Sequence, residues 1–245
     1  MKRESVVCTA ALAALVGAFL PGCGTADAVA PPSRDAVTRP AGWTEETHGD
    51  GVDADYDAAF PQDEVKRVVI SIAAEDWAAM QSNLTELLGP RGVERPGRPM
   101  APGMPGWIDM TPVNPMWVPA TVECDGLTWT NVGLRYKGNS SLRSGWNSGS
   151  LKLPLKLDFD EYEDEHPEIG NQRFYGFKQL SLSNAFRDGT YMRDALAVDI
   201  FREADLPAAE TAFYEVAIDY GDGAVDLGLY VVIEVVDDTV IDRFY

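Results

Sequence analysis

The stretch that decides the fold reads Val132-Gly-Leu-Arg-Tyr-Lys-Gly-Asn-Ser-Ser-Leu142. Apolar residues alternate with other residues as far as Tyr136, which is the period of a half-buried β-strand. The strand then enters the polar turn Lys137-Gly138-Asn139-Ser140-Ser141. This turn offers a cation, backbone N–H groups freed by glycine and two hydroxyl groups, which are the groups that surround a bound phosphate or another oxyanion. The stretch therefore predicts a strand that ends in an oxyanion-binding turn.

A second lysine-bearing segment follows and reads Leu151-Lys-Leu-Pro-Leu-Lys-Leu-Asp-Phe159. Its alternation predicts that Lys152, Lys156 and Asp158 share one face of a strand. Two consecutive strands that present cations around a glycine turn favour a nucleotide site. The alternative is that these lysines belong to an ordinary solvated face of a sheet.

The N-terminus has the pattern of an export signal. A basic start is followed by an uncharged run over residues 5–20 and then by Leu20-Pro-Gly-Cys-Gly24. The uncharged run is too short for a confident membrane-spanning helix. The pattern resembles a bacterial lipoprotein signal, in which Cys23 is lipidated and becomes the mature N-terminus. The alternatives are an ordinary secretory signal and a short membrane anchor.

We therefore expect an exported lipoprotein that is anchored to a membrane through lipid on Cys23. It would lie on the outer membrane of a Gram-negative cell, or otherwise at the cell surface. The expected domains are a signal peptide over 1–23, a disordered tether over 24–60 and a folded domain over 61–245. The tether is predicted because residues 24–60 are small, polar, acidic and rich in proline. Within the domain, residues 89–119 are rich in proline, glycine and methionine, and predict an irregular excursion.

Charge and cysteine content exclude several classes of function. The net charge is −19, and removal of residues 1–23 leaves 18 basic and 38 acidic side chains. Such a chain repels nucleic acid, so we expect no nucleic-acid partner and predict that any polyanion binds in a local cationic pocket. Only Cys124 remains after export, which leaves no intramolecular disulfide and no cysteine metal cluster. The positions of His48 and His166, in the tether and in an acidic loop, argue against a histidine triad or a zinc site.

The pattern along the chain predicts an α+β domain in which an antiparallel sheet carries one packed helix. The expected strands span residues 65–72, 118–123, 128–136, 152–159, 177–182, 211–219 and 227–236. Helices are expected over 74–88 and 191–204, the second with Thr190 as its N-cap. Its buried stripe would be formed by Met192, Leu196, Val198 and Phe201. The acidic run at 158–168 favours a solvated loop, with a calcium-dependent adhesion module as the alternative.

Five segments in this order resemble the spore coat protein H (CotH) kinase-like family. They are residues 132–142, 153–160, 176–184, 191–201 and 228–237. The family is described as secreted or surface-bound atypical protein kinases that use ATP and a divalent metal. The resemblance implies the small lobe of such a kinase, with ATP and Mg²⁺ or Mn²⁺ as cofactors and a protein as substrate or partner. Because the chain stops at Tyr245, we expect the catalytic lobe to be absent and the chain to be inactive in phosphate transfer.

The resemblance also implies roles for individual residues. The Lys137-Gly138-Asn139-Ser140-Ser141 turn would replace a glycine-rich phosphate loop. Lys156 would hold the α- and β-phosphates, with Lys152 as the competing candidate, and Asp194 would orient that lysine. Glu234 would lie near the hinge, where its backbone could meet adenine. The second hypothesis is a non-catalytic surface protein that binds a partner chain or has a structural role.

Overall fold

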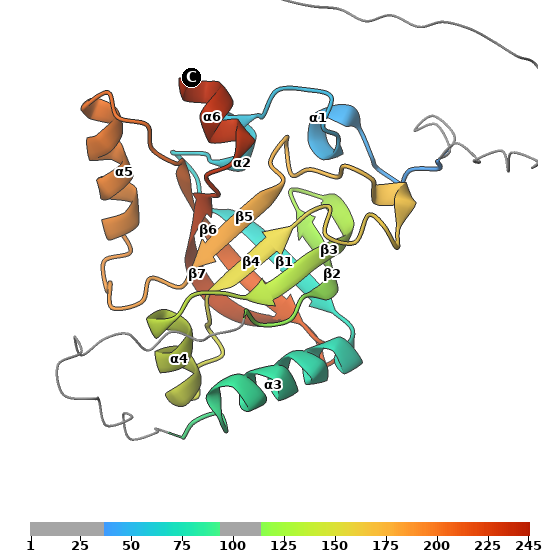
Figure 1. Cartoon of the computed structure of the whole chain (residues 1–245), viewed down its shortest axis with the longest axis vertical. Helices are drawn as coiled ribbons and strands as arrows, with labels where there is room; N and C mark the ends of the chain where they lie inside the picture. Colours follow the sequence, from blue (N-terminus) through green and yellow to red (C-terminus); the bar gives the residue numbers. More distant parts are fainter. Residues whose placement is uncertain (1–36, 94–113) are drawn as a thin grey trace, which may run out of the picture. The chain divides into compact units, whose positions relative to one another are not determined.

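In the described part of the chain, seven β-strands close into a barrel (Figure 1). The computed structural model describes residues 37–93 and 114–245. The strands are β1 (Lys66–Ile72), β2 (Val118–Cys124), β3 (Leu127–Tyr136), β4 (Leu155–Asp158), β5 (Gln179–Ser183), β6 (Thr211–Asp219) and β7 (Val225–Glu234). Their order around the barrel is β1-β2-β3-β4-β5-β7-β6, and β6 pairs with β1 to complete the circle.

The closure overturns the expected fold class. Neighbouring strands run antiparallel except β1 and β6, which pair in parallel between Lys66 and Ser71 on one strand and Tyr214 and Asp219 on the other. The expected α+β fold, an antiparallel sheet with one packed helix in the manner of a kinase small lobe, is therefore wrong. The strands themselves were predicted because alternation is local. The β1–β6 pairing joins segments far apart in the sequence, which no local pattern reveals.

Two β-bulges lie in the barrel wall. The register between β2 and β3 shifts between Ala120 and Val122, and the register between β6 and β7 shifts between Val216 and Ala217. A bulge adds a residue to one strand and increases its bend and twist. Asn131 and Gly228 adopt positive φ angles of 53° and 79° beside these shifts, a conformation that asparagine and glycine tolerate better than most residues. The bulges thus supply curvature that favours closure.

The helices differ in how many of their apolar side chains are buried against the barrel. They are α1 (Glu45–His48), α2 (Tyr56–Ala59), α3 (Ala74–Leu88), α4 (Ser140–Asn147), α5 (Arg193–Glu203) and α6 (Asp238–Phe244). In the view of Figure 1, α3 runs below the barrel and α5 stands to its left. The helix expected over 74–88 is confirmed as α3, and its Met80, Leu84 and Leu88 join the barrel core. Among the described residues, no helix is both long and apolar enough to cross a membrane.

Helix α5 contradicts the expectation of a buried stripe. None of its residues is buried, and the exposed fractions of Met192, Leu196 and Phe201 are 41%, 50% and 49%. Its first turn is held by the Asp188 carboxylate, which accepts a hydrogen bond from the Arg193 backbone N–H at 2.9 Å. The helix was found by its periodicity, but the assumption that its apolar side faces the barrel is wrong.

Residues 37–60 do not form the expected tether. This segment contains α1 and α2, and both Ala59 and Phe60 lie in the barrel core. His48 is 1% exposed and stacks on Trp129 of β3 with ring centroids 4.6 Å apart. The prediction of a disordered tether is thus wrong for 37–60, because a few aromatic residues anchor an otherwise polar segment. Residues 1–36 and most of the 89–119 excursion (94–113) lie outside the described residues.

Candidate functional site

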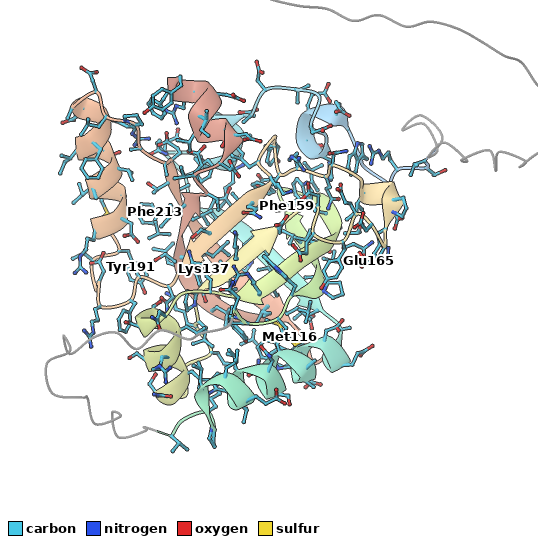
Figure 2. All side chains as sticks on the ribbon, viewed as in Figure 1. Met116, Lys137, Phe159, Glu165, Tyr191 and Phe213 are labelled. Atoms are coloured by element: carbon cyan, nitrogen blue, oxygen red, sulfur yellow. The ribbon has the colours of Figure 1, made fainter. Side chains whose placement is uncertain are left out.

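A row of side chains crosses the outer face of β3, β4, β5 and β7. Arg135 lies opposite Lys156, Lys156 opposite Ser181, and Ser181 opposite Ile233. Residues directly opposite each other on neighbouring strands point to the same face, and the neighbours of Arg135, Lys156 and Ser181 along their strands lie in the core. Lys137 follows β3 on the same side, and its ammonium group donates a hydrogen bond to the Ser181 hydroxyl. Figure 2 shows Lys137 on the barrel wall.

Lys137 lies in an environment that disfavours its charged form. The pKa of its ammonium group is lowered, first by burial and then by the positive charges of Lys156 and Arg135. The carboxylate of Asp194 acts in the opposite direction. Three cations therefore share one surface, and the protein neutralises their charge only in part.

Lys156 has more acidic neighbours than Lys137. Burial and the charge of Arg135 lower its pKa, whereas Asp158, Asp237 and Glu161 raise it. Burial raises the pKa of Asp158 to about 6, because its carboxylate lies next to Asp160 in a buried position. Lys156 is half-buried in β4, whereas Asp158, which the sequence placed on the same face together with Lys152, is buried.

Arg135 completes the group of cations. Its guanidinium carbon lies 4.8 Å from the centroid of the Trp117 ring, and its Nε atom lacks a hydrogen-bond partner among the described residues. Burial lowers its pKa, against the effect of Glu161 and Asp158. Glu161 reaches this face because Gly133 leaves room: a Cβ atom at Gly133 would lie 2.5 Å from the Cβ of Glu161.

The predicted oxyanion turn leads into a helix that the sequence did not reveal. Gly138 has φ +85°, and a Cβ atom there would lie 2.7 Å from the Ser141 Oγ. Asn139 is the N-cap of α4 without a side-chain capping hydrogen bond, so the first-turn N–H groups at Ser140 and Ser141 are not capped. A strand, a glycine turn and a helix N-terminus in succession form a common arrangement for binding anions.

A cavity of ≈ 290 Å³ opens between this turn and the start of α5. Its lining includes Lys137, Ser141, Ser183, Asp194 and Ile233. Asp194 lies in the first turn of α5, and its carboxylate accepts a hydrogen bond from the Ser183 hydroxyl at 3.2 Å. The structure therefore brings Asp194 to Lys137. The resemblance had paired it with Lys156, whose described acidic neighbours are other residues.

Lys152 and Glu234 have other surroundings. Lys152 precedes β4, donates a hydrogen bond to the Tyr191 hydroxyl at 2.9 Å and lies 5.2 Å from the Tyr230 ring centroid. Its backbone carbonyl accepts a hydrogen bond from Asn184, so it ties down the loop before α5. The buried Glu234 carboxylate accepts a hydrogen bond from the Tyr56 hydroxyl at 2.8 Å, and its backbone N–H is bonded to the Glu210 carbonyl. That N–H is therefore not free to meet an adenine base.

The acidic loop after β4 is tied to its surroundings by ion pairs and hydrogen bonds. Asp160 forms ion pairs with Arg173 at 2.6 Å and Lys178 at 3.0 Å, and the Glu163 carboxylate accepts a hydrogen bond from the Asn171 backbone N–H. Within residues 37–93 and 114–245, no three His, Cys, Asp or Glu side chains gather closely enough to hold a metal ion. The described residues thus do not fit a divalent metal held by the protein alone, and we assign no step to one.

Sequence reasoning missed two members of the site, Arg135 and Ser181. Arg135 could have been found, because it lies two residues before Lys137 in the quoted strand and alternation places both on one face. Ser181 could not, because its contact with Lys137 depends on which strands pair.

Comparisons with known proteins agree with the sequence resemblance. No curated protein matches the chain. Residues 134–244 match the family model described as CotH kinase protein, a span that runs from β3 to α6 and includes Arg135, Lys137, Lys156 and Asp194. The resemblance of this part of the chain to the CotH kinase family is therefore confirmed.

Proposed function

We propose that this CotH-like chain binds the phosphate groups of a nucleotide, ATP foremost, on the outer face of β3, β4 and β5. The observation that carries the proposal is the gathering of Arg135, Lys137 and Lys156 on one face of a chain with a net charge of −19. Neighbouring like charges repel each other, and a bound anion relieves that repulsion. Most of this acidic surface repels a polyanion, so binding would concentrate at this local patch.

The proposed arrangement assigns the cavity of ≈ 290 Å³ beside Lys137 to one phosphate group. The Ser141 hydroxyl and the uncapped first turn of α4 would donate hydrogen bonds to its oxygens. Lys156 and Arg135 continue the positive charge along the sheet, where further phosphate groups would lie. Asp194 would keep Lys137 in place through its charge.

A divalent metal is a separate part of the proposal. The family resemblance implies Mg²⁺ or Mn²⁺ with the nucleotide, but the described residues have no cluster that would hold such an ion by itself. Any metal would therefore enter with the phosphate groups. Binding of ATP in the presence of a chelator and binding with added Mg²⁺ consequently test two different claims.

A thermal shift with ATP tests the binding proposal. A ligand at a hundred times its Kd stabilises the folded state by about 2.7 kcal/mol, which for a domain of this size raises the Tm by roughly 5–10 °C. We expect this shift in the wild-type chain and its loss in Lys156→Ala, because that change removes a central positive charge. Arg67→Ala is the matched control, since Arg67 is exposed on β1 and also carries one positive charge.

Equal shifts in Lys156→Ala and Arg67→Ala would contradict the proposed location. No shift in a wild-type sample that is folded by circular dichroism would contradict nucleotide binding itself. The measurement with added Mg²⁺ tests only whether the metal increases the affinity for ATP.

Export and lipidation also remain proposals. The Leu20-Pro-Gly-Cys-Gly24 pattern supports lipid attachment at Cys23, which would anchor the chain to a membrane. Expression of the full chain in a bacterium with radiolabelled palmitate should label the wild type. Cys23→Ser should lose the label if Cys23 is the attachment site, and retained label would contradict it.

A second candidate function is non-catalytic binding of a protein partner. It is favoured by the apolar side chains that α5 exposes, among them Leu196 and Ile200 at 50% and 62%. If ATP does not raise the Tm, partner binding becomes the favoured function. Light scattering of the wild type and of Leu196→Gln/Ile200→Gln would then show whether these side chains support association.

A further inference from the structure

The lysines of this chain are few, and their surroundings differ sharply. The chain holds six lysines, of which Lys2 lies outside the described residues. Lys66 and Lys178 form ion pairs with Asp125 and Asp160 at 2.5 and 3.0 Å. Each of these two ammonium groups is therefore held in an ion pair with a carboxylate.

Lys152 is held against the side chain of Tyr191. Its ammonium group donates to the Tyr191 hydroxyl and lies 4.6 Å from the Tyr191 ring centroid, so the ring faces stabilise the cation. The position of Tyr191 beside the lower end of α5 can be followed in Figure 2.

Lys137 differs from these three lysines. Within the described residues its hydrogen-bond partner is the neutral hydroxyl of Ser181, and two further cations lie on the same face. Burial and those cations lower its pKa, and the Asp194 charge opposes them only in part. Lys137 also lines the cavity of ≈ 290 Å³.

We propose that Lys137 is a site of covalent modification by small aldehydes that carry a phosphate group, an inference that rests on the proposed phosphate-binding function. Lys156 and Arg135 would hold the phosphate group on the sheet, and the aldehyde carbon would then lie in the cavity beside Lys137. The neutral amine attacks that carbon and forms a C–N bond. The carbonyl oxygen leaves as water with the two hydrogens of the amine, which yields an imine without an oxidant or reductant.

Lys156 is the competing nucleophile because its pKa is also lowered. Asp158, Glu161 and Asp237 lie close enough to favour its charged form, whereas among the described residues Asp194 is the acidic side chain that has this effect on Lys137. We therefore assign the reaction to Lys137 and the holding of the phosphate group to Lys156.

Labelling with pyridoxal 5′-phosphate tests the inference on the wild-type chain. Borohydride reduction converts the imine into a stable amine, and mass spectrometry of the digested protein identifies the labelled lysine. Burial and the neighbouring cations disfavour the charged form of Lys137, so we expect more label on Lys137 than on Lys66, Lys152 or Lys178. Pyridoxal, which lacks the phosphate group, is the matched control and should label Lys137 far less. Excess ATP should protect Lys137.

Each other outcome overturns the inference. The assignment to Lys137 would be refuted if the label lay mainly on Lys156, or if it were spread equally over the five described lysines. Equal labelling by pyridoxal and its phosphate would refute the role of the phosphate group. Lys137→Arg keeps the positive charge and should remove the label without moving it to Lys156.

The thermal shift with ATP separates this inference from the proposed function. A clear ATP shift without label on Lys137 would refute the inference and leave nucleotide binding in place. Phosphate-independent label on Lys137 without an ATP shift would refute both phosphate claims, since it would show only a reactive amine.

Discussion

His48 is held as a neutral imidazole between Trp43 and Trp129. Its Nε2 atom lies 3.1 Å from the Thr128 carbonyl oxygen, and its Nδ1 atom lies 2.6 Å from the Thr47 hydroxyl. A carbonyl only accepts hydrogen bonds, so Nε2 carries the proton and the Thr47 hydroxyl donates to Nδ1. Burial lowers the pKa of His48, against the raising effect of the Thr128 carbonyl. The buried pocket therefore favours the uncharged ring.

This geometry predicts that stability falls in mild acid. A histidine with a lowered pKa in the folded state is protonated first in the unfolded state, whose pKa is about 6.5. Its contribution is thus fully present above about pH 6.5 and is lost as the pH falls toward the folded-state pKa. Urea unfolding at pH 8 and pH 5.5 should show a lower free energy of unfolding at pH 5.5, a loss that His48→Gln lacks. If the free energy of unfolding fell equally with pH in the wild type and in His48→Gln, the role assigned to His48 would be contradicted.

The helices α3 and α5 have similar sequence patterns and different roles. Leu84 of α3 is fully buried in the barrel core, whereas Leu196 of α5 is 50% exposed. Helical periodicity marks one side of each helix as apolar, but it does not tell what that side contacts. Helix α3 therefore stabilises the barrel, and α5 contributes little apolar burial to it.

The same leucine-to-alanine change should have different effects in the two helices. Leu84→Ala leaves a cavity in the core and should lower the free energy of unfolding by about 2–5 kcal/mol. Leu196→Ala removes a side chain that is already half in solvent and should change it by no more than about 0.5 kcal/mol. Urea titrations of both variants measure the difference. A large loss of unfolding free energy in Leu196→Ala would contradict the exposed position of this side chain.

The parallel pairing of β1 with β6 turns the sheet into a barrel. Val69 in the middle of β1 lies opposite Glu123 of β2 on one side and Ala217 of β6 on the other. In an open sheet with β1 at the edge, one row of its backbone groups would face solvent. In the barrel, both rows form hydrogen bonds.

Amide hydrogen exchange distinguishes the closed barrel from an open sheet with β1 at its edge. All amides in the centre of β1 should exchange slowly, whereas an edge strand would show slow and fast exchange at alternate residues. Val69→Pro should also lower the stability by on the order of 2 kcal/mol or more, because it removes a donor between two partner strands. Val65→Pro is the control, since Val65 precedes β1 and is 54% exposed. Fast exchange at every second amide of β1 would contradict closure.

The sequence by itself determined the local elements and the chemistry of the turn. The alternation before Lys137 and the glycine after it predicted a strand that ends in a turn, because strand period and turn residues are properties of neighbouring positions. It also determined the CotH resemblance, since that depends on the order of short segments. Helix α4 was not predicted from the sequence, because serine, glycine and asparagine at 144–148 favour turns over helices.

Only the tertiary structure decided which segments meet. It paired β1 with β6, placed residues 37–60 on the barrel, and brought Ser181 and Asp194 to Lys137. It also showed the partners of Lys152 and Glu234, which are the Tyr191 hydroxyl and the Glu210 carbonyl. The physical reason is that pairing and burial depend on contacts between residues distant in the chain, whose free energies a local pattern does not contain.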